Sequence, residues 1–217
     1  MKTTATSLAA VIASITFARH GKAVGKPGEP DSQRQLNELG LSQAKKLGEK
    51  IAGLPVDLVV SSPLPRAVNT IKIATGKDEI IPLEELGVTD DPKDPLNIMF
   101  EALKYSPLVS SDPNSLGYFQ HELGENLKLW ATTALIRILS AAKEVSEKLG
   151  RPVHVVVGGH AVCQPALAWI LCQELEGELT SELIGFAESV NLGEAEAIHI
   201  NLTGADGSVA YDYITQE

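Results

Sequence analysis

The sequence predicts an α/β fold of three layers, in which helices cover both faces of a mainly parallel central sheet. Short apolar runs alternate with segments whose apolar residues recur every three or four positions, which predicts alternating strands and helices. The apolar runs are almost continuous, as in parallel strands buried on both faces. Near the C-terminus apolar and polar residues alternate strictly, which predicts an antiparallel hairpin at the edge of the sheet.

The first half of the chain gives two strands and two helices. The run AAVIASITFA at 9–18 is the first buried strand, and a loop rich in glycine and proline follows at 21–30. A helix begins near Ser42 and places its apolar residues on one face up to Pro55. VDLVVSS at 56–62 is the second buried strand. Pro63 and Pro65 open the next helix, which ends at a C-cap glycine, Gly76.

The second half continues the alternation after an irregular segment. Residues 79–86 form a short strand and its exit, and 88–124 are rich in Asp, Pro and Ser. A long helix spans about 125–149, with a stripe of Ala131, Leu135, Ile138, Ala142, Val145 and Leu149. VHVVVGG at 153–159 is the third buried strand, and a helix with Pro165 in its first turn follows, running to about Leu175.

The chain ends in the predicted hairpin. Residues 197–203 and 208–215 are its strands, and GADG at 204–207 is the turn. No internal repeat or linker interrupts the pattern, so 1–217 are expected to form one domain. The long irregular segment 88–124 is expected to be a cap, because its two ends adjoin the proposed site described below. A surface excursion that packs elsewhere is the alternative.

Composition excludes several classes of partner. The chain has 217 residues, of which 44% are apolar and 21% charged, so it can form a sizeable core. A formal net charge of −10 repels nucleic acid and anionic membrane, and neither is an expected partner. The two cysteines, Cys163 and Cys172, lie in one apolar segment without CxxC spacing and are expected to be buried thiols.

The N-terminus allows two readings. Lys2 followed by an apolar stretch could be a signal peptide, but cleavage near Ala18 would remove the first strand. Because that strand presents the proposed site, we expect the segment to stay and the protein to be cytoplasmic.

Polar residues follow each predicted parallel strand at its carboxyl end, where α/β sheets bind ligands. Arg19 and His20 follow the first strand, and His160 follows the third. The other residues at these strand exits are Ser61, Ser62, Arg66, Glu84 and Glu85. Two arginines, two histidines and a carboxylate therefore converge on one edge of the sheet.

This set of residues fits phosphoryl transfer. Guanidinium groups match the oxygens of a phosphoryl group, and a neutral imidazole can attack phosphorus and carry the group covalently. A carboxylic acid can protonate the leaving oxygen and later activate water. Gly21 lets the backbone come close beside His20. The cationic side chains can stabilise the developing charge, so we expect neither a metal ion nor another cofactor.

The motifs FARHG, SSPLPRA, PLEEL and VVVGGHA, in this order, resemble the histidine phosphatase superfamily, which has the phosphoglycerate mutase-like fold. The resemblance implies that His20 is the phosphorylated nucleophile. It implies that His160 acts in catalysis beside the phosphate group. The residues expected to bind substrate are Arg19, Gly21, Lys22 and Arg66. Glu85 fits the position of the general acid, with Glu84 as the alternative.

The resemblance favours the phosphatase branch. Lys22 stands where phosphoglycerate mutases usually carry glutamate, and DSQRQLNELG at 31–40 is similar to small phosphohistidine phosphatases. We therefore expect a histidine acid phosphatase-like hydrolase that acts on a small phosphorylated substrate or a phosphoprotein. A mutase-type phosphotransferase and a non-catalytic phosphate-binding module are the alternatives. His121, His154 and His199 are expected to take no part.

Overall fold

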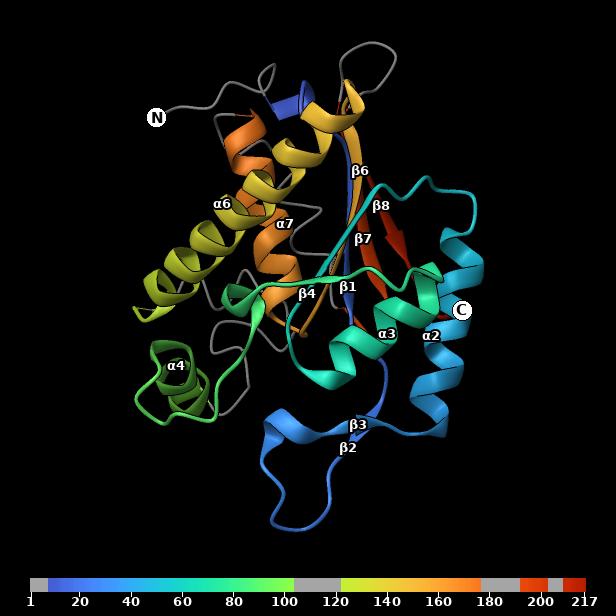
Figure 1. Cartoon of the computed structure of the whole chain (residues 1–217). Helices are drawn as coiled ribbons and strands as arrows, with labels where there is room; N and C mark the ends of the chain where they lie inside the picture. Colours follow the sequence, from blue (N-terminus) through green and yellow to red (C-terminus); the bar gives the residue numbers. More distant parts are fainter. Residues whose placement is uncertain (1–7, 104–121, 177–191, 203–208) are drawn as a thin grey trace.

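The computed structural model describes residues 8–103, 122–176, 192–202 and 209–217 (Figure 1). Its main sheet has the strand order β5-β4-β6-β1-β7-β8. The first four strands along this order are parallel: β5 (Ile81–Pro82), β4 (Leu58–Ser61), β6 (Val153–Gly159) and β1 (Ile12–Arg19). The last two, β7 (Ala197–Asn201) and β8 (Ala210–Ile214), are antiparallel neighbours. The predicted mixed sheet is confirmed.

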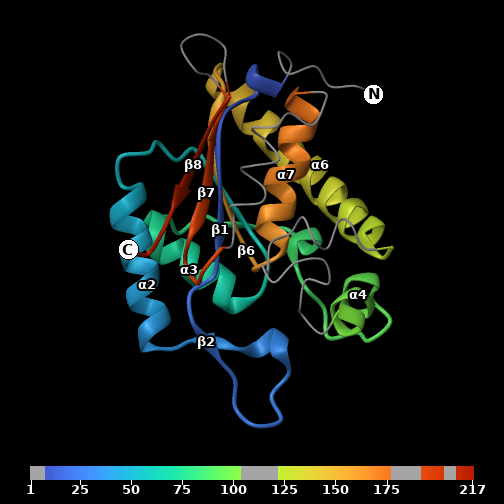
Figure 2. The same ribbon diagram turned by 180° about the vertical axis from the view of Figure 1, so that it is seen from behind.

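Helices cover both faces of this sheet, as predicted. In Figures 1 and 2, α2 (Glu38–Ile51) and α3 (Pro65–Thr75) lie on one side, and α6 (Gly124–Leu149) and α7 (Cys163–Glu176) lie on the other. The buried residues accordingly form two apolar clusters, one on each face. The alternation of β1 explains this, because its successive side chains enter opposite clusters: Phe17 belongs to one and Ala18 to the other.

Local signals determine where several helices begin and end. Gly76 and Gly150 follow α3 and α6 with φ of 65° and 66°, the left-handed conformation that a C-cap glycine adopts without strain. The helix expected from Ser42 begins earlier, at Glu38, because the Asn37 side chain accepts a hydrogen bond from the Gly40 amide at 2.9 Å.

Two further sequence expectations differ from the structure. β1 begins at Ile12 rather than at residue 9, because Leu8 and Ala9 are helical. Leu149 is 49% exposed at the end of α6 and is not part of the buried stripe, whereas Ala131, Ile138 and Ala142 are fully buried. The helix ends at Leu149, so no further turn of α6 covers its side chain.

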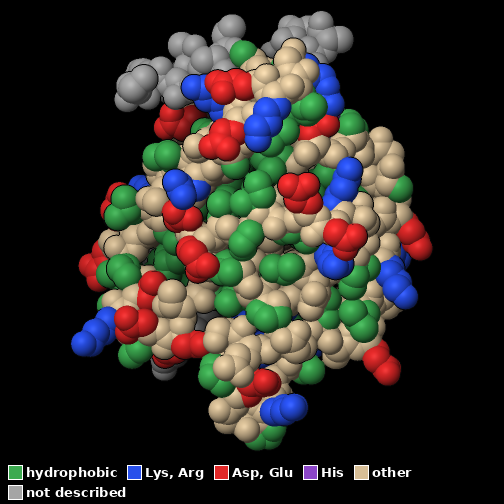
Figure 3. Space-filling view, viewed as in Figure 1, with side chains coloured by type: hydrophobic (Ala, Val, Ile, Leu, Met, Phe, Trp, Pro, Cys, Tyr) green, Lys and Arg blue, Asp and Glu red, His purple; other side chains and the backbone are tan. Residues whose placement is uncertain are grey.

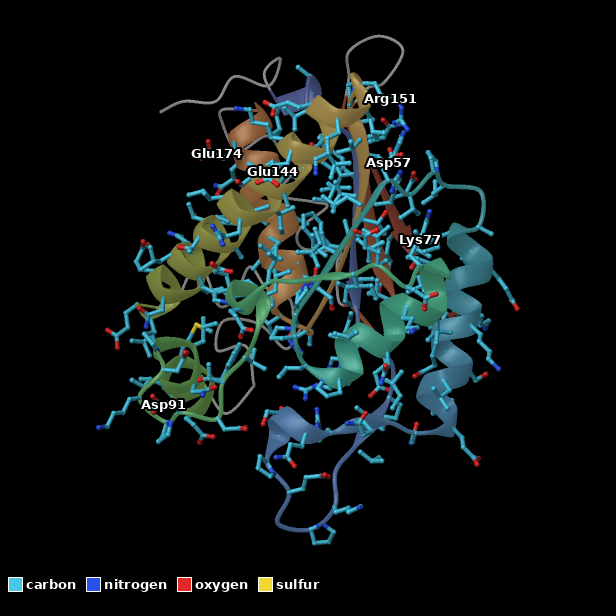
Figure 4. All side chains as sticks on the ribbon, viewed as in Figure 1. Asp57, Lys77, Asp91, Glu144, Arg151 and Glu174 are labelled. Atoms are coloured by element: carbon cyan, nitrogen blue, oxygen red, sulfur yellow. The ribbon has the colours of Figure 1, made fainter. Side chains whose placement is uncertain are left out.

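Several short elements lie beyond the carboxyl ends of the parallel strands. The small hairpin β2 (Ala23–Val24) and β3 (Gln35–Leu36) lies below the main sheet in Figure 1, and α4 (Pro95–Leu103) lies beside it. Two 3₁₀ turns, η1 (Asp31–Gln33) and η2 (Glu84–Leu86), belong to the same end of the molecule. At the opposite end Asp57 and Arg151 form an ion pair of 2.7 Å (Figure 4).

The hairpin turn at 204–207 and the middle of the expected cap, 104–121, lie outside the described residues, as does His121. Among the described helices, none has the length and apolar character needed to cross a membrane. The face drawn in Figure 3 mixes acidic and basic side chains, and the chain carries a net charge of −10.

Candidate active site

A cavity of about 660 Å³ opens at the carboxyl ends of the parallel strands. The residues after β1 and β6 line it with Arg19, His20 and His160, and α3 contributes Arg66. Lys22 and Arg34 contribute from the segment that contains β2 and β3. Five of the predicted site residues therefore meet in one cavity, although they are separated by up to 141 positions in the sequence (from Arg19 to His160).

The ring of His20 is held in one tautomer. Its Nδ1 lies 2.8 Å from the carbonyl oxygen of Gly21, which can accept a hydrogen bond but cannot donate one, so Nδ1 carries the proton. Its Nε2 lies 3.3 Å from Arg66 Nε, which can donate but cannot accept. Nε2 is therefore the nitrogen with the lone pair, which is what a nucleophilic imidazole requires.

Burial keeps the His20 ring neutral. Desolvation lowers its pKa to about 4, and the positive charges of Arg66, Arg19 and Arg34 add to this effect, while the hydrogen bond to Gly21 opposes it. Desolvation by burial also lowers the pKa of His160 well below its usual value, and His20 and the arginines lower it further. Both imidazole rings are therefore neutral at neutral pH, each with one N–H group.

His160 is fixed by a serine from the second strand exit. Its Nε2 lies 2.9 Å from the hydroxyl of Ser62, which is fully buried. The two histidine rings then meet edge to face, with their centroids 5.4 Å apart. Because β4 and β6 are neighbours in the sheet, the residues at their exits are brought together by strand pairing.

Arg66 is almost completely buried, and its guanidinium group is held on both sides. Its Nη1 donates to the backbone carbonyl of Asp31 at 2.6 Å, and its Nη2 to the Asp31 carboxylate at 2.7 Å. The side chain is 2% exposed, which is rare for arginine without a paired charge. Desolvation lowers its pKa from the usual value, and the Asp31 charge opposes that shift.

Two further arginines complete the cationic wall. Arg19 Nη1 donates to the carbonyl of Leu192 at 2.7 Å, and among the described residues its buried Nε has no hydrogen-bond partner. That N–H group is a donor available to a ligand oxygen. Arg34 Nε lies 2.9 Å from the second carboxylate oxygen of Asp31. One aspartate therefore bridges Arg34 and Arg66.

Gly21 and Lys22 lie where the chain leaves β1. A side chain at Gly21 would meet the carbonyl oxygen of Gly40 at 2.7 Å, so glycine is required for this close approach to α2. The Gly21 amide donates to the hydroxyl of Thr70 at 3.0 Å, which ties the strand exit to α3. Lys22 lines the cavity, and its Nζ is ion-paired with Glu194 at 3.2 Å.

The proposed general acid lies apart from these residues. Glu85, on η2, is ion-paired with Arg137 of α6 at 2.9 Å and is not among the residues that line the cavity. Glu84 is exposed and does not line it either. The carboxylates that do line the cavity are Asp31, Asp90, Glu101 and Glu194.

Part of the expected cap forms one wall of the cavity. Val88, Phe100 and Glu101 line it, and Phe100 also belongs to the core cluster. Met99 is fully buried in the same cluster and does not line the cavity. Cys163 also lines the cavity, but burial and the charge of Asp94 raise its pKa to about 12, so it is a protonated thiol and not a nucleophile. Cys172 is likewise buried, as predicted.

The other two described histidines have structural partners. His154 Nδ1 lies 2.8 Å from the hydroxyl of Ser14, and His199 Nδ1 lies 2.9 Å from that of Thr16. Neither lines the cavity.

Sequence reasoning missed Asp31 and Arg34. Both stand in the stretch 31–40 that resembles phosphohistidine phosphatases. The resemblance pointed to this stretch, but neither residue was predicted to belong to the site. Ser62 was noted at a strand exit, but its contact with His160 depends on the pairing of β4 with β6.

Comparisons with known proteins bear on the family and on the fold. Residues 15–87 match the model of the histidine phosphatase superfamily (branch 1). No curated protein matches the chain at a significant level. The matched segment contains His20, Arg66 and Glu85.

Three solved structures have the same fold. A mycobacterial glucosyl-3-phosphoglycerate phosphatase complexed with VO3 is 20% identical, with 93% of this chain and 98% of that chain covered and a TM-score of 0.56. A phosphoserine phosphatase from Entamoeba histolytica, in complex with 3-phosphoglyceric acid, is 19% identical, with 93% and 96% covered and a TM-score of 0.55.

The protein histidine phosphatase SixA, complexed with tungstate, is 15% identical, with 94% and 97% covered and a TM-score of 0.51. Residues 15–87 thus match the model of the histidine phosphatase superfamily, and nearly the whole chain shares the fold of these phosphatases.

Proposed function

We propose that the protein is a metal-independent phosphohydrolase that forms a phosphohistidine on His20. The observation that carries the proposal is the state of the His20 ring: Nδ1 is protonated against Gly21, and Nε2 keeps its lone pair beside a buried arginine. A neutral imidazole surrounded by guanidinium groups suits attack on phosphorus, because the arginines stabilise the charge on the phosphoryl oxygens.

The reaction has two steps. Nε2 of His20 attacks phosphorus, and the bond from phosphorus to the leaving oxygen breaks while an acid protonates that oxygen. Water then attacks the phosphohistidine, the P–N bond breaks, and the conjugate base of the acid takes the proton from water. Arg19 and Arg66 are proposed to bind the phosphoryl oxygens through both steps, and His160 to donate to one of them.

Glu85 stays our proposal for the acid, with Glu84 as the alternative. For this role its carboxyl group would have to exchange Arg137 for the leaving group. Asp90 and Glu101 already line the cavity and are the carboxylates against which Glu85 has to be compared.

The substrate is a phosphomonoester or a phosphorylated protein side chain. The structural neighbours include phosphatases named for phosphoserine, for glucosyl-3-phosphoglycerate and for protein histidine, so all three classes belong in a substrate panel. A run with 2,3-bisphosphoglycerate tests the mutase alternative in parallel.

The test is a single-turnover labelling experiment on metal-free protein. Acid-quenched protein should lose the bound phosphate in acid and keep it in base, as a phosphohistidine does. His20→Gln, which keeps a polar group beside Arg66 but has no nucleophile, should carry no label. An active preparation that never accumulates such a phosphate, even under single-turnover conditions, would contradict the covalent mechanism.

A further inference from the structure

Asp31 occupies the donors that a phosphate group would use. Its carboxylate accepts a hydrogen bond from Arg66 Nη2 at 2.7 Å with one oxygen. Its other oxygen is ion-paired with Arg34 Nε at 2.9 Å, without the geometry of a hydrogen bond. Two guanidinium groups that line the cavity therefore share one anion that belongs to the protein itself. A phosphoryl group is recognised by the same pairing of oxygens with guanidinium N–H groups.

The contacts of Arg66 show how complete this occupation is. Each of its three nitrogens donates to a protein atom: Nε to His20 Nε2, Nη1 to the Asp31 carbonyl and Nη2 to the Asp31 carboxylate. In this arrangement an N–H group points at the lone pair with which His20 would attack. Arg66 must therefore redirect donors toward phosphoryl oxygens before the reaction can begin.

We propose that the Asp31 carboxylate competes with the oxyanion of the substrate for Arg66 and Arg34: it binds the two arginines in the empty site, yields to an incoming phosphate group and returns as product phosphate leaves. The proposal rests on the proposed function only in that the cavity takes a phosphate group. It adds Asp31 as a residue that sets the affinity of the site for oxyanions.

Exposure decides which partner moves. The Asp31 side chain is 51% exposed, whereas Arg66 is 2% exposed. A carboxylate displaced from Asp31 can enter water at little cost, but a guanidinium group without its partner would leave a buried, unpaired charge. An entering phosphate dianion replaces the single charge of Asp31 and keeps the charge of Arg66 paired. Exchange of one anion for the other therefore costs little free energy.

A purely structural role predicts the opposite effect. If Asp31 only holds the arginines in place for the phosphate, removing its charge should loosen them and weaken oxyanion binding. If Asp31 competes, the same change should strengthen binding. The sign of one measured change in affinity therefore separates the two roles.

The experiment is isothermal titration of vanadate and of inorganic phosphate into the wild-type protein and into Asp31→Asn. Asparagine keeps the size and one hydrogen-bonding oxygen but removes the charge. If the carboxylate holds the arginines for about nine-tenths of the time, its loss should tighten Kd about tenfold. Asp31→Glu restores a carboxylate and should return Kd toward the wild-type value.

Asp91→Asn is the matched control. It makes the same change in net charge on the segment that leads to α4 (Figure 4), but Asp91 does not line the cavity. Its Kd values should stay within about twofold of wild type. A similar tightening in this variant would attribute the effect to net charge and would overturn the proposal.

Unchanged or weaker oxyanion binding in a folded Asp31→Asn protein, checked by thermal unfolding, would also overturn it. The titration involves no turnover, so it fails independently of the proposed function. If His20 becomes labelled but Asp31→Asn does not bind oxyanions more tightly, only the proposed competition is refuted. If Asp31→Asn binds oxyanions more tightly but His20 is never labelled, the covalent mechanism is refuted and the competition is supported.

Discussion

At the scale of single residues, the site depends on ionisable groups that are kept from water. His20, His160 and Arg66 are each less than 10% exposed. Contacts of Arg66 with His20 and of His160 with Ser62 replace part of the lost hydration. Burial keeps both imidazoles neutral, and it concentrates the positive charge of the arginines around the reacting nitrogen. Burial of these groups therefore affects both the reactivity of His20 and the dependence of protein stability on pH.

The lowered pKa of His20 makes stability depend on pH. Between about 4 and the usual 6.5 the unfolded chain takes up a proton at this residue and the native protein does not. Stability therefore rises with pH across this window and is lost as the pH falls through it. Urea unfolding at pH 7, 6 and 5 should show a shallower decline for His20→Gln than for wild type. Equal slopes would mean that His20 titrates normally in the native protein.

Arg66 should serve the bound phosphate as well as the transition state, because the charge on the oxygens is present in both. We expect Arg66→Lys to keep the charge but lose the paired contacts, and so to lower both kcat/KM and vanadate affinity by roughly tenfold or more. Arg151→Lys, at the opposite end of the sheet, is the control. A rate that falls while vanadate affinity is unchanged would exclude Arg66 as a phosphate ligand.

The general acid can be found by its dependence on the leaving group. Loss of the acid should cost roughly 10²–10⁴-fold with alkyl phosphates and much less with p-nitrophenyl phosphate, whose leaving group needs little protonation. Glu85→Gln is expected to give this pattern. Glu84→Gln, Asp90→Asn and Glu101→Gln are tested beside it, and the pattern in one of these instead would transfer the role.

At the scale of elements, α4 supplies both core and cavity wall. Met99 and Phe100 both belong to the core cluster, but only Phe100 also lines the cavity. The segment 88–124, which contains α4, was expected to cap the site. The helix instead turns successive side chains to different neighbours, so only part of the helix faces the substrate.

This difference gives a paired test of the cap. Phe100→Ala should change relative rates across the substrate panel and largely spare p-nitrophenyl phosphate, which needs little more than the phosphate site. Met99→Ala should lower the free energy of unfolding by about 2–5 kcal/mol and leave relative rates unchanged. Selectivity that responds to Met99 and not to Phe100 would argue against a cap that contacts substrate.

At the scale of the whole molecule, an acidic protein brings four cationic side chains into one cavity, beside the four carboxylates that also line it. The net charge is −10, yet the cavity gathers Arg19, Arg34, Arg66 and Lys22. We expect this local charge to replace a metal ion. Activity should therefore survive exhaustive dialysis against EDTA, with a zinc-dependent phosphatase as the positive control for chelation. Loss of activity that returns with one divalent metal would refute the metal-independent mechanism.

The sequence alone determined the alternation of strands and helices, the exits that carry Arg19, His20 and His160, and the glycine caps of α3 and α6. These features follow from local causes: the period of the apolar residues, and the backbone conformation that glycine adopts without strain. Parallel pairing of β1, β4 and β6 then brings the exits to one edge, as expected.

Tertiary structure alone decided the partners of the charged side chains. Asp31 meets Arg66 across 35 positions, Ser62 meets His160 across 98, and Glu85 meets Arg137 rather than the cavity. No local pattern specifies these pairs, because an ion pair depends on where packing leaves two side chains and not on their spacing in the chain. The sequence thus determined which groups reach the edge of the sheet, and packing decided which of them face one another.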